Sequence, residues 1–451
     1  MQSVLAKTSL CRTQALGGRW YECDDCQGIT KVYNSCGDRH CPACSGAKRR
    51  DFSDHASQLL LEGVEYYQVV FTLPEILSAI ALANRNGLAD LLFQSAWKAL
   101  KKSISTEQGY DPAALMVLHT WNQKLNEHWH VHALVPGGGP GLEDQSWTVA
   151  TPPPLENTPR KYLVDAINLR TSFRKFAIAK LQRLRRDGKL SFGGSLEYLR
   201  QDDAWDAMIE DLKAVDWVSH IEPPRSDESR PEHVVRYLTR YLTGGPISDY
   251  RITAADTKSV TFLAREGRTT GGDDVQVPCT LPRDEFVRRW CLHVQSDQLT
   301  KTRYFGGWSN PRKDGYLERC AIALDDAGVG IETEIDFDVQ SIEASESEHL
   351  GDTSDCESSL VCEHCGSESL TLIDEIDKPS WTDVFRTSNE ACPDWYRESL
   401  DLDDRRFWDA AMGEGFSDWY DWYLKSEQES AKESEAEPDR PPATQLEFDW
   451  L

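Results

Sequence analysis

The chain has 451 residues, and its 49 Lys and Arg against 75 Asp and Glu give a formal net charge of −26. The charge is uneven: residues 1–320 carry 41 basic and 39 acidic side chains, a net of +2, whereas residues 321–451 carry 8 and 36, a net of −28. A near-neutral body can bind a polyanion, so the total charge does not exclude a nucleic-acid-binding protein. The longest apolar runs, near 69–73 and 113–118, are far shorter than the roughly 20 residues that span a bilayer, which excludes a membrane-spanning helix.

The composition predicts a folded protein in a reducing compartment. Hydrophobic residues make up 39% of the chain, and 15 Trp, 15 Tyr and 14 Phe are enough for two or three domains with cores of their own. Thirteen Cys without an apolar leader favour metal ligation and free thiols over a disulfide framework, so we expect a cytoplasmic protein. The acidic excess and the 18 Lys against 31 Arg suit a salt-loving host, although an acidic regulatory tail in a mesophile explains the charge equally well.

Three regions are expected in chain order, and the fold class is α+β. Residues 1–55, dense in Cys, Gly and Arg, predict a small zinc-binding domain; residues 56–325 predict the main body; residues 326–451 form an acidic region, partly disordered, with a local Cys cluster. Apolar periodicity and turn residues in the body predict strands at Tyr66–Leu73, Ala114–Trp121, Trp129–Val135 and Val215–Ile221, strand pairs near 250–264, and helices at about 88–100, 161–186, 231–243 and 283–295.

The N-terminal cysteines predict a zinc site. Cys23-x2-Cys26 and Cys41-x2-Cys44 are separated by fourteen residues, and each pair can bring two thiolates to one tetrahedral ion. Cys36, His40 and Cys11 are surplus to such a site, so they could replace a ligand, form a second site or be structural. The adjoining run Lys48–Arg49–Arg50 suits phosphate contact, or is simply a solvated face.

A histidine series predicts a second metal site. In the sequence Glu127-His-Trp-His-Val-His132, residues two apart project from the same face of a strand, so His130 and His132 can chelate one divalent ion, and His128 lies on that face too. A further ligand is needed, and His119 and Gln123 on the preceding strand and turn are candidates.

A later helix predicts paired nucleophiles. Tyr237 and Tyr241 stand one helical turn apart, as do Arg236 and Arg240, which could contact DNA. Alone, aromatic residues at this spacing more often fill a core. Together with a His-x-His strand they suit metal-assisted attack on a phosphodiester, in which a tyrosine hydroxyl forms a covalent phosphotyrosine. That intermediate conserves the ester bond energy, in keeping with a sequence that has no P-loop.

These residues carry a family resemblance that covers about residues 11–325. The chain resembles the rolling-circle transposases of the insertion-sequence-91 family and the related common-region elements, within the HUH (His-hydrophobic-His) endonuclease superfamily. The matching blocks are CRTQALGG at 11–18, YNSCGDRHCPACSG at 33–46, VVFTLPEIL at 69–77, LHTWNQKLNEHWHVHALVPGGG at 118–139, VVRYLTRYLTGGPIS at 234–248 and DEFVRRWCLHV at 284–294.

The resemblance implies a transposase that nicks and rejoins single-stranded DNA at element ends. It implies an antiparallel catalytic sheet flanked by helices, catalytic Mg²⁺ or Mn²⁺ on His130 and His132, paired nucleophiles Tyr237 and Tyr241, and structural Zn²⁺ in the Cys-rich domain. Two alternatives stay open: a rolling-circle replication initiator of a plasmid, and a catalytically dead, zinc-dependent DNA-binding regulator.

The acidic region holds two further motifs. Cys362-x2-Cys365, with Cys356 and Cys392 nearby, could form a second small zinc site or bind no metal. The last residues, 445–451, loosely resemble a sliding-clamp-binding peptide, but we favour the interpretation that they are an uncommitted acidic end.

Overall fold

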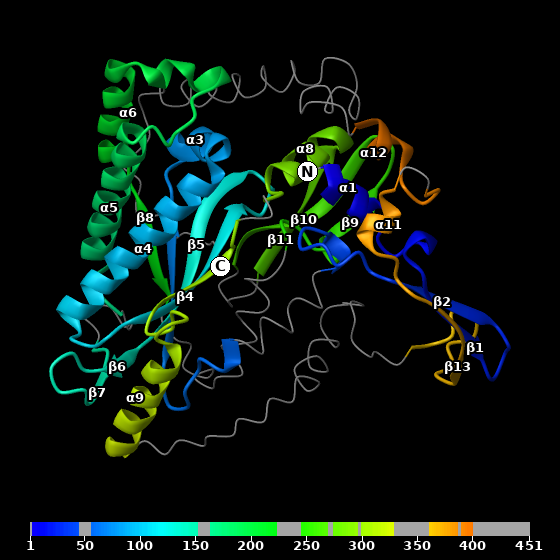
Figure 1. Cartoon of the computed structure of the whole chain (residues 1–451), viewed down its shortest axis with the longest axis horizontal. Helices are drawn as coiled ribbons and strands as arrows, with labels where there is room; N and C mark the ends of the chain where they lie inside the picture. The colour runs from blue at the N-terminus through cyan, green and yellow to red at the C-terminus, as the bar shows by residue number, and fades with distance from the viewer. Residues whose placement is uncertain are drawn as a thin grey trace. The chain divides into compact units, whose positions relative to one another are not determined.

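The computed structural model describes residues 2–44, 56–151, 163–222, 245–268, 274–295, 299–328, 360–386 and 389–399. The chain packs as two units (Figure 1). Unit 1 comprises residues 1–47, 245–294 and 350–451, and unit 2 comprises residues 48–244 and 295–349. The expected continuous body over 56–325 is therefore interrupted, because residues 245–294 pack in unit 1.

Unit 2 is built on a five-stranded sheet in the order β12-β4-β5-β3-β8, in which every neighbouring pair is antiparallel. Its strands are β3 (Tyr66–Thr72), β4 (Ala113–Trp121), β5 (Glu127–Pro136), β8 (Val218–Glu222) and β12 (Thr302–Gly306). The antiparallel sheet with helices confirms the predicted α+β class.

A short turn joins β4 to β5, and its own side chains stabilise its conformation. The side-chain oxygen of Asn122 accepts hydrogen bonds from the backbone N–H of Lys124 at 2.9 Å and of Asn126 at 3.0 Å. Leu125 takes a left-handed conformation, with φ of 62°. Such an Asx turn reverses the chain within a few residues. It thereby sets the register in which His119 lies opposite His130.

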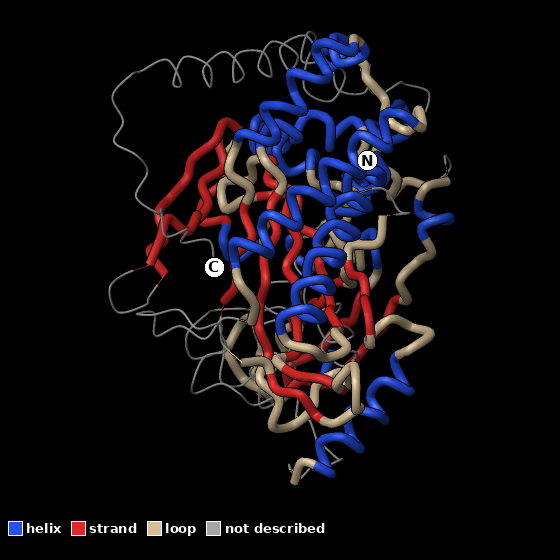
Figure 2. Tube along the Cα trace, turned by 90° about the vertical axis from the view of Figure 1, so that its left-hand side faces the viewer, coloured by secondary structure: helices blue, strands red, loops and turns tan. Residues whose placement is uncertain are grey.

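Helices cover one face of this sheet and bury the larger core. They are α3 (Ser78–Ala83), α4 (Arg85–Glu107), α5 (Ala166–Arg186) and α6 (Asp202–Ala214). Alternate strand residues such as Phe71 and Val131 pack beneath them, and Phe71 meets Phe173 of α5 edge to face, with ring centroids 5.0 Å apart. Figure 2, seen from the side on which α5 and α6 lie in Figure 1, shows the helices in front of the strands.

The opposite face of the sheet is divided between a smaller core and polar residues. Leu115, Val117 and Leu134 pack against Tyr316 and Cys320 of α9 (Lys313–Asp326). Farther along the same face, the strands present histidines rather than apolar side chains. This face also carries the short hairpin of β6 (Gly138–Pro140) and β7 (Trp147–Val149), which contacts α9.

The described residues of unit 1 form two small antiparallel sheets. The first has the order β13-β1-β2, formed by β1 (Gly18–Cys23), β2 (Ile29–Tyr33) and β13 (Leu370–Ile376). The second has the order β11-β10-β9, formed by β9 (Ile252–Ala255), β10 (Ser259–Arg268) and β11 (Asp274–Pro282). The α-helices in the part of this unit that the structure describes are α1 (Gln2–Ser9), α8 (Arg283–Leu292), α11 (Trp381–Val384) and α12 (Asp394–Ser399).

Most predicted elements are found, and the structure also contains elements that were not predicted, among them β1, β2, β11, β12 and α9. The strand predicted over Val215–Ile221 begins only at Val218, because residues 202–214 form α6, which was not predicted. The acidic region contributes β13 to a sheet with the N-terminal strand β1. The predicted helix 231–243 and the terminal peptide 445–451 lie outside the described residues. Among the described helices, none has the length and apolar character needed to cross a membrane.

Candidate metal centres

Three histidines of unit 2 converge on the polar face of the sheet. His119 comes from β4, and His130 and His132 come from β5. The register pairs His119 with His130, and His132 follows two residues later on the same face. Each histidine offers one ring nitrogen, and these three nitrogens all lie within 4.8 Å of one another. The three imidazoles can therefore share a single ion.

The three rings surround a common point at differing angles. Ring centroids lie 5.3 Å apart for His119 and His130, 4.8 Å for His119 and His132, and 4.9 Å for His130 and His132. No pair is stacked face to face; the interplanar angles run from 60° to 84°. Imidazoles tilted in this way can direct their lone pairs at one position, as a metal ligand set does.

The protonation of these imidazoles suits metal binding. Nδ1 of His130 lies 2.9 Å from the backbone carbonyl of His128, and since a carbonyl only accepts, Nδ1 carries the proton and Nε2 keeps its lone pair. Burial, and secondarily His132 and His128, lowers the pKa of His130 well below its usual value. Burial, then His128, lowers the pKa of His132 to about 4. Both rings are therefore neutral near pH 7, the form that binds a metal.

A glutamine supports His132. Gln68 of β3 is buried, and its amide nitrogen Nε2 lies 2.6 Å from Nδ1 of His132. A half-turn of the amide exchanges its oxygen and nitrogen in the same space. With the oxygen facing the ring, Gln68 accepts from Nδ1–H and leaves Nε2 of His132 for a metal. The sequence did not single out Gln68, since one glutamine in an apolar strand has no distinguishing spacing.

The remaining candidates for this site have different positions. His128 stands at the start of β5, with its ring 4.9 Å from that of His130, and is not one of the three converging imidazoles. Gln123 lies in the turn after β4. The predicted nucleophiles and DNA contacts lie outside the described residues: Tyr237, Tyr241, Arg236, Arg240, Lys48, Arg49 and Arg50.

The cysteines of unit 1 form two groups of four, which corrects the predicted single zinc site. Cys41 and Cys44 join Cys11 and Cys36 in one group (site A), whereas Cys23 and Cys26 join Cys362 and Cys365 in another (site B). The two Cys-x2-Cys pairs had been combined because they are neighbours in sequence. In the structure, β1 and β2 separate the two pairs, and each pair lies beside two other cysteines. His40 instead lies against Asp38, with Nδ1 3.0 Å from Oδ1.

Site A has the character of a buried structural metal site. Cys36, Cys41 and Cys44 are buried beside Leu16 and Val384, and the Sγ atom of Cys44 lies 3.2 Å from that of Cys11 and 3.4 Å from that of Cys36. Hydrogen bonds from Cys36 and then Cys41 lower the pKa of Cys11 to about 7, and hydrogen bonds from Cys11, Cys36 and Cys41 lower the pKa of Cys44. The same hydrogen bonds raise the pKa of Cys36 and Cys41, so Cys11 and Cys44 are the two thiols that lose their protons most readily. Thiolates are the ligands that zinc prefers.

Two families of known proteins match the chain. A family described as "Transposase zinc-binding domain" matches residues 1–73, which contain all of site A. A family described as "Putative transposase" matches residues 113–314, which contain the three converging histidines.

Two curated relatives match most of the chain. The "Putative transposase y4qJ" of Sinorhizobium fredii is 33% identical over 319 residues, which are 70% of this chain and 76% of that protein. The "Transposase for insertion sequence element IS801" of Pseudomonas savastanoi pv. phaseolicola is 28% identical over 335 residues, 71% of this chain and 73% of that protein. No solved structure gives a significant match.

These matches identify the family, but they do not support two of the expectations drawn from the sequence. Nothing in them supports docking to a sliding clamp or a salt-loving host. They do agree in both halves of the molecule: the zinc-binding segment and the histidine-bearing segment each match a transposase family, and one relative exceeds 30% identity over most of both chains. The chain belongs to the insertion-sequence-91 family of transposases, with that family's zinc-binding domain at its N-terminal end.

Proposed function

We propose that this transposase nicks and rejoins single-stranded DNA through a covalent phosphotyrosine, and that it moves its element by rolling-circle transposition. The observation that carries the proposal is the convergence of His119, His130 and His132 on one face of the sheet. Three buried imidazoles, of which His130 and His132 have lowered pKa values, form a ligand set for a divalent ion, here Mg²⁺ or Mn²⁺.

The histidine site has a defined part in the reaction. A divalent ion bound there supplies positive charge that polarises the scissile phosphate. His130 is held by the His128 carbonyl and His132 by Gln68, so two ligands keep their orientation without the ion. Because these ligands are already oriented, little reorganisation free energy is needed when the DNA binds. Gln123 and His128 are the further candidates for a coordination position.

The nucleophile is proposed to be Tyr237 or Tyr241. Its phenol releases a proton as the oxygen forms a bond to phosphorus, one phosphodiester P–O bond breaks, and the departing oxygen takes up a proton. Reversal of this step by a hydroxyl of another DNA end restores the phosphodiester and releases the tyrosine. Arg236, Arg240 and the run Lys48–Arg50 are proposed to contact the DNA backbone.

A covalent adduct tests this assignment. Full-length protein incubated with a labelled single-stranded hairpin from its element end and Mn²⁺ should form a protein–DNA adduct, and EDTA should prevent it. Peptide mass spectrometry should place the nucleotide on Tyr237 or Tyr241, and the double variant Tyr237→Phe, Tyr241→Phe should form none. An adduct that persists in the double variant would show that the nucleophile is another residue.

The experiment also separates the alternatives. A catalytically dead regulator would bind the hairpin without forming an adduct. A plasmid replication initiator would share the chemistry, but both matching families and both relatives are described as transposases, which favours transposition.

A further inference from the structure

We propose that Cys23, Cys26, Cys362 and Cys365 of site B bind a second structural zinc ion, and that this ion joins the N-terminal domain to the segment beyond residue 360. The matched zinc-binding domain ends at residue 73, so half of this ligand set lies outside it. The proposal does not depend on the DNA chemistry of unit 2.

The four sulfurs have the spacing of a tetrahedral thiolate site. Sγ of Cys23 lies 3.6 Å from that of Cys365, and Sγ of Cys26 lies 3.5 Å from that of Cys362. All four lie within 4.8 Å of one another. A Zn–S bond of about 2.3 Å in tetrahedral geometry puts sulfurs about 3.8 Å apart, close to these distances.

The two halves of site B have the same backbone conformation. The N–H of Cys23 donates to the carbonyl of Gly28, and that of Gln27 donates back to the carbonyl of Cys23. In the second half, the N–H of Cys362 donates to Ser367, five residues on, and that of Gly366 donates back to Cys362. The residue four positions after the first cysteine has positive φ in both halves, 58° at Gln27 and 76° at Gly366. Two equivalent turns, each presenting two thiolates, make up a zinc ribbon.

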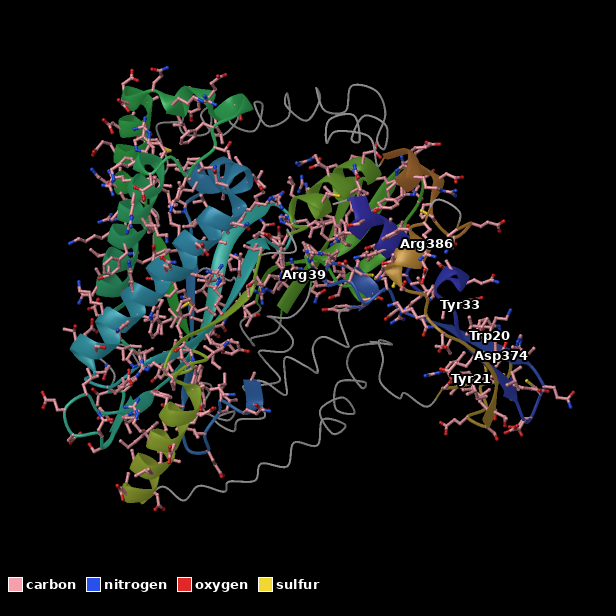
Figure 3. All side chains as sticks on the ribbon, viewed as in Figure 1. Trp20, Tyr21, Tyr33, Arg39, Asp374 and Arg386 are labelled. Atoms are coloured by element: carbon pink, nitrogen blue, oxygen red, sulfur yellow. The ribbon has the colours of Figure 1, made fainter. Side chains whose placement is uncertain are left out.

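The halves are tied together around the sulfurs although 336 residues separate Cys26 from Cys362. Asp24 accepts hydrogen bonds from the hydroxyls of Ser369 at 2.6 Å and Thr371 at 2.9 Å. A Cβ on Gly28 would lie only 2.3 Å from the ring of His364, so the two turns approach each other closely at this glycine. Beyond them β1 pairs with β13, with Trp20 opposite Asp374 (Figure 3).

Burial distinguishes metal binding from core packing. Cys23 and Cys362 are buried, whereas Cys26 and Cys365 are exposed. A cysteine that only fills a core is buried on all sides, and two exposed thiols beside two buried ones instead describe a surface ion held at one edge of a small sheet. Four thiolates in tetrahedral array select zinc, or iron, over the hard cations that oxygen ligands bind.

Metal content tests the proposal. Purified full-length protein, freed of loosely bound ions on a chelating resin under reducing conditions, should hold two zinc ions per chain by elemental analysis. Cys362→Ser with Cys365→Ser should hold one, as should Cys23→Ser with Cys26→Ser. Cys36→Ser with Cys41→Ser should lose the other ion. The matched control Cys392→Ser, a buried cysteine outside both groups, should keep two.

Thiol protection in the unaltered protein gives a second readout that needs no variant. Exposed Cys26 and Cys365 should resist N-ethylmaleimide while zinc is bound, and should become alkylated together with Cys23 and Cys362 when a strong chelator removes it. The proposal is overturned if Cys26 and Cys365 react at once in protein that holds two zinc ions, if the Cys362/Cys365 variant retains both ions, or if the metal of site B is iron. Loss of both ions from a variant would indicate unfolding, and the alkylation result then decides.

Discussion

At the residue scale, the histidine site shows how far spacing alone can go. Two-residue periodicity placed His130 and His132 on one face, and the neighbouring strand offered His119, which the structure brings to the same point. The supporting contact from Gln68 could not be predicted, because it depends on which strand lies beside β5. Local sequence carries little information on that choice.

Removing the Gln68 amide should weaken metal binding without unfolding the protein. Gln68→Leu leaves the His132 ring unsupported at Nδ1, and loss of such an outer contact typically costs about 10- to 100-fold in metal affinity. Titration calorimetry with Mn²⁺ would measure it. Gln276→Leu, an exposed glutamine of β11, is the matched control and should bind as the wild type does. Equal affinity in the Gln68 variant would remove the residue from the site.

The same burial predicts how metal affinity depends on pH. A histidine with the ordinary pKa of about 6.5 competes with protons for its metal below that pH. Burial lowers the pKa of His132 to about 4, so this ring is still neutral at pH 5.5, and burial lowers the pKa of His130 well below 6.5 in the same direction. Mn²⁺ affinity should therefore change little between pH 7 and 5.5 and fall only nearer pH 4. A tenfold or larger loss by pH 5.5 would show that the imidazoles titrate as exposed groups.

At the element scale, strongly patterned segments were predictable and weakly patterned ones were not. The strands β3, β4 and β5 are almost wholly buried and rich in apolar residues, and their sequences identified them. By contrast, β13 is exposed along most of its length and lies in the acidic region, so neither its burial pattern nor its composition indicates a strand. The helix α6 does carry a helical signal, because Trp205, Met208, Ile209 and Leu212 recur at the spacing of one helical face, so the sequence was sufficient to predict it.

The contact between β3 and α5 should be a main source of stability in unit 2. Phe71 is fully buried against Phe173, so Phe71→Ala should lower the free energy of unfolding by about 3–5 kcal/mol, through lost burial and a residual cavity. Denaturant unfolding followed by circular dichroism would measure the change. The exposed Ile167 of α5 provides the control: Ile167→Ala should change stability by less than about 0.5 kcal/mol. A loss below 1 kcal/mol for Phe71→Ala would contradict this packing.

At the scale of the whole molecule, the sequence identified the family but misplaced the connections. The division at residues 55 and 325 followed composition, whereas the fold returns residues 245–294 and 360–399 to the unit that holds the N-terminus. The split of Cys-x2-Cys pairs between sites A and B has the same cause. Pairing across more than 300 residues depends on tertiary structure, which neither spacing nor charge encodes locally.

The C-terminal charge should oppose DNA binding. Residues 400–451 carry 15 acidic and 5 basic side chains, a net of −10, and a stop after Ser399 leaves both cysteine sites intact. We expect this truncation to raise single-strand affinity several-fold at low salt. The gain should shrink towards 1 M salt, where the screening length is about 3 Å. Fluorescence anisotropy would measure both. A full-length chain with these acidic residues changed to Asn and Gln should behave like the truncation, and unchanged affinity in both would rule out competition by the tail.

The central claim is that an ion held by His119, His130 and His132 drives single-strand cleavage, and its most direct test is the initial cleavage rate as a function of Mn²⁺ concentration. The wild type should be inactive in EDTA and should saturate with Mn²⁺. His130→Ala and His132→Ala should each lose at least about 100-fold in rate, since several kcal/mol of charge stabilisation are removed, while still binding the hairpin. Cleavage that continues in EDTA, or at the wild-type rate in either variant, would contradict the account.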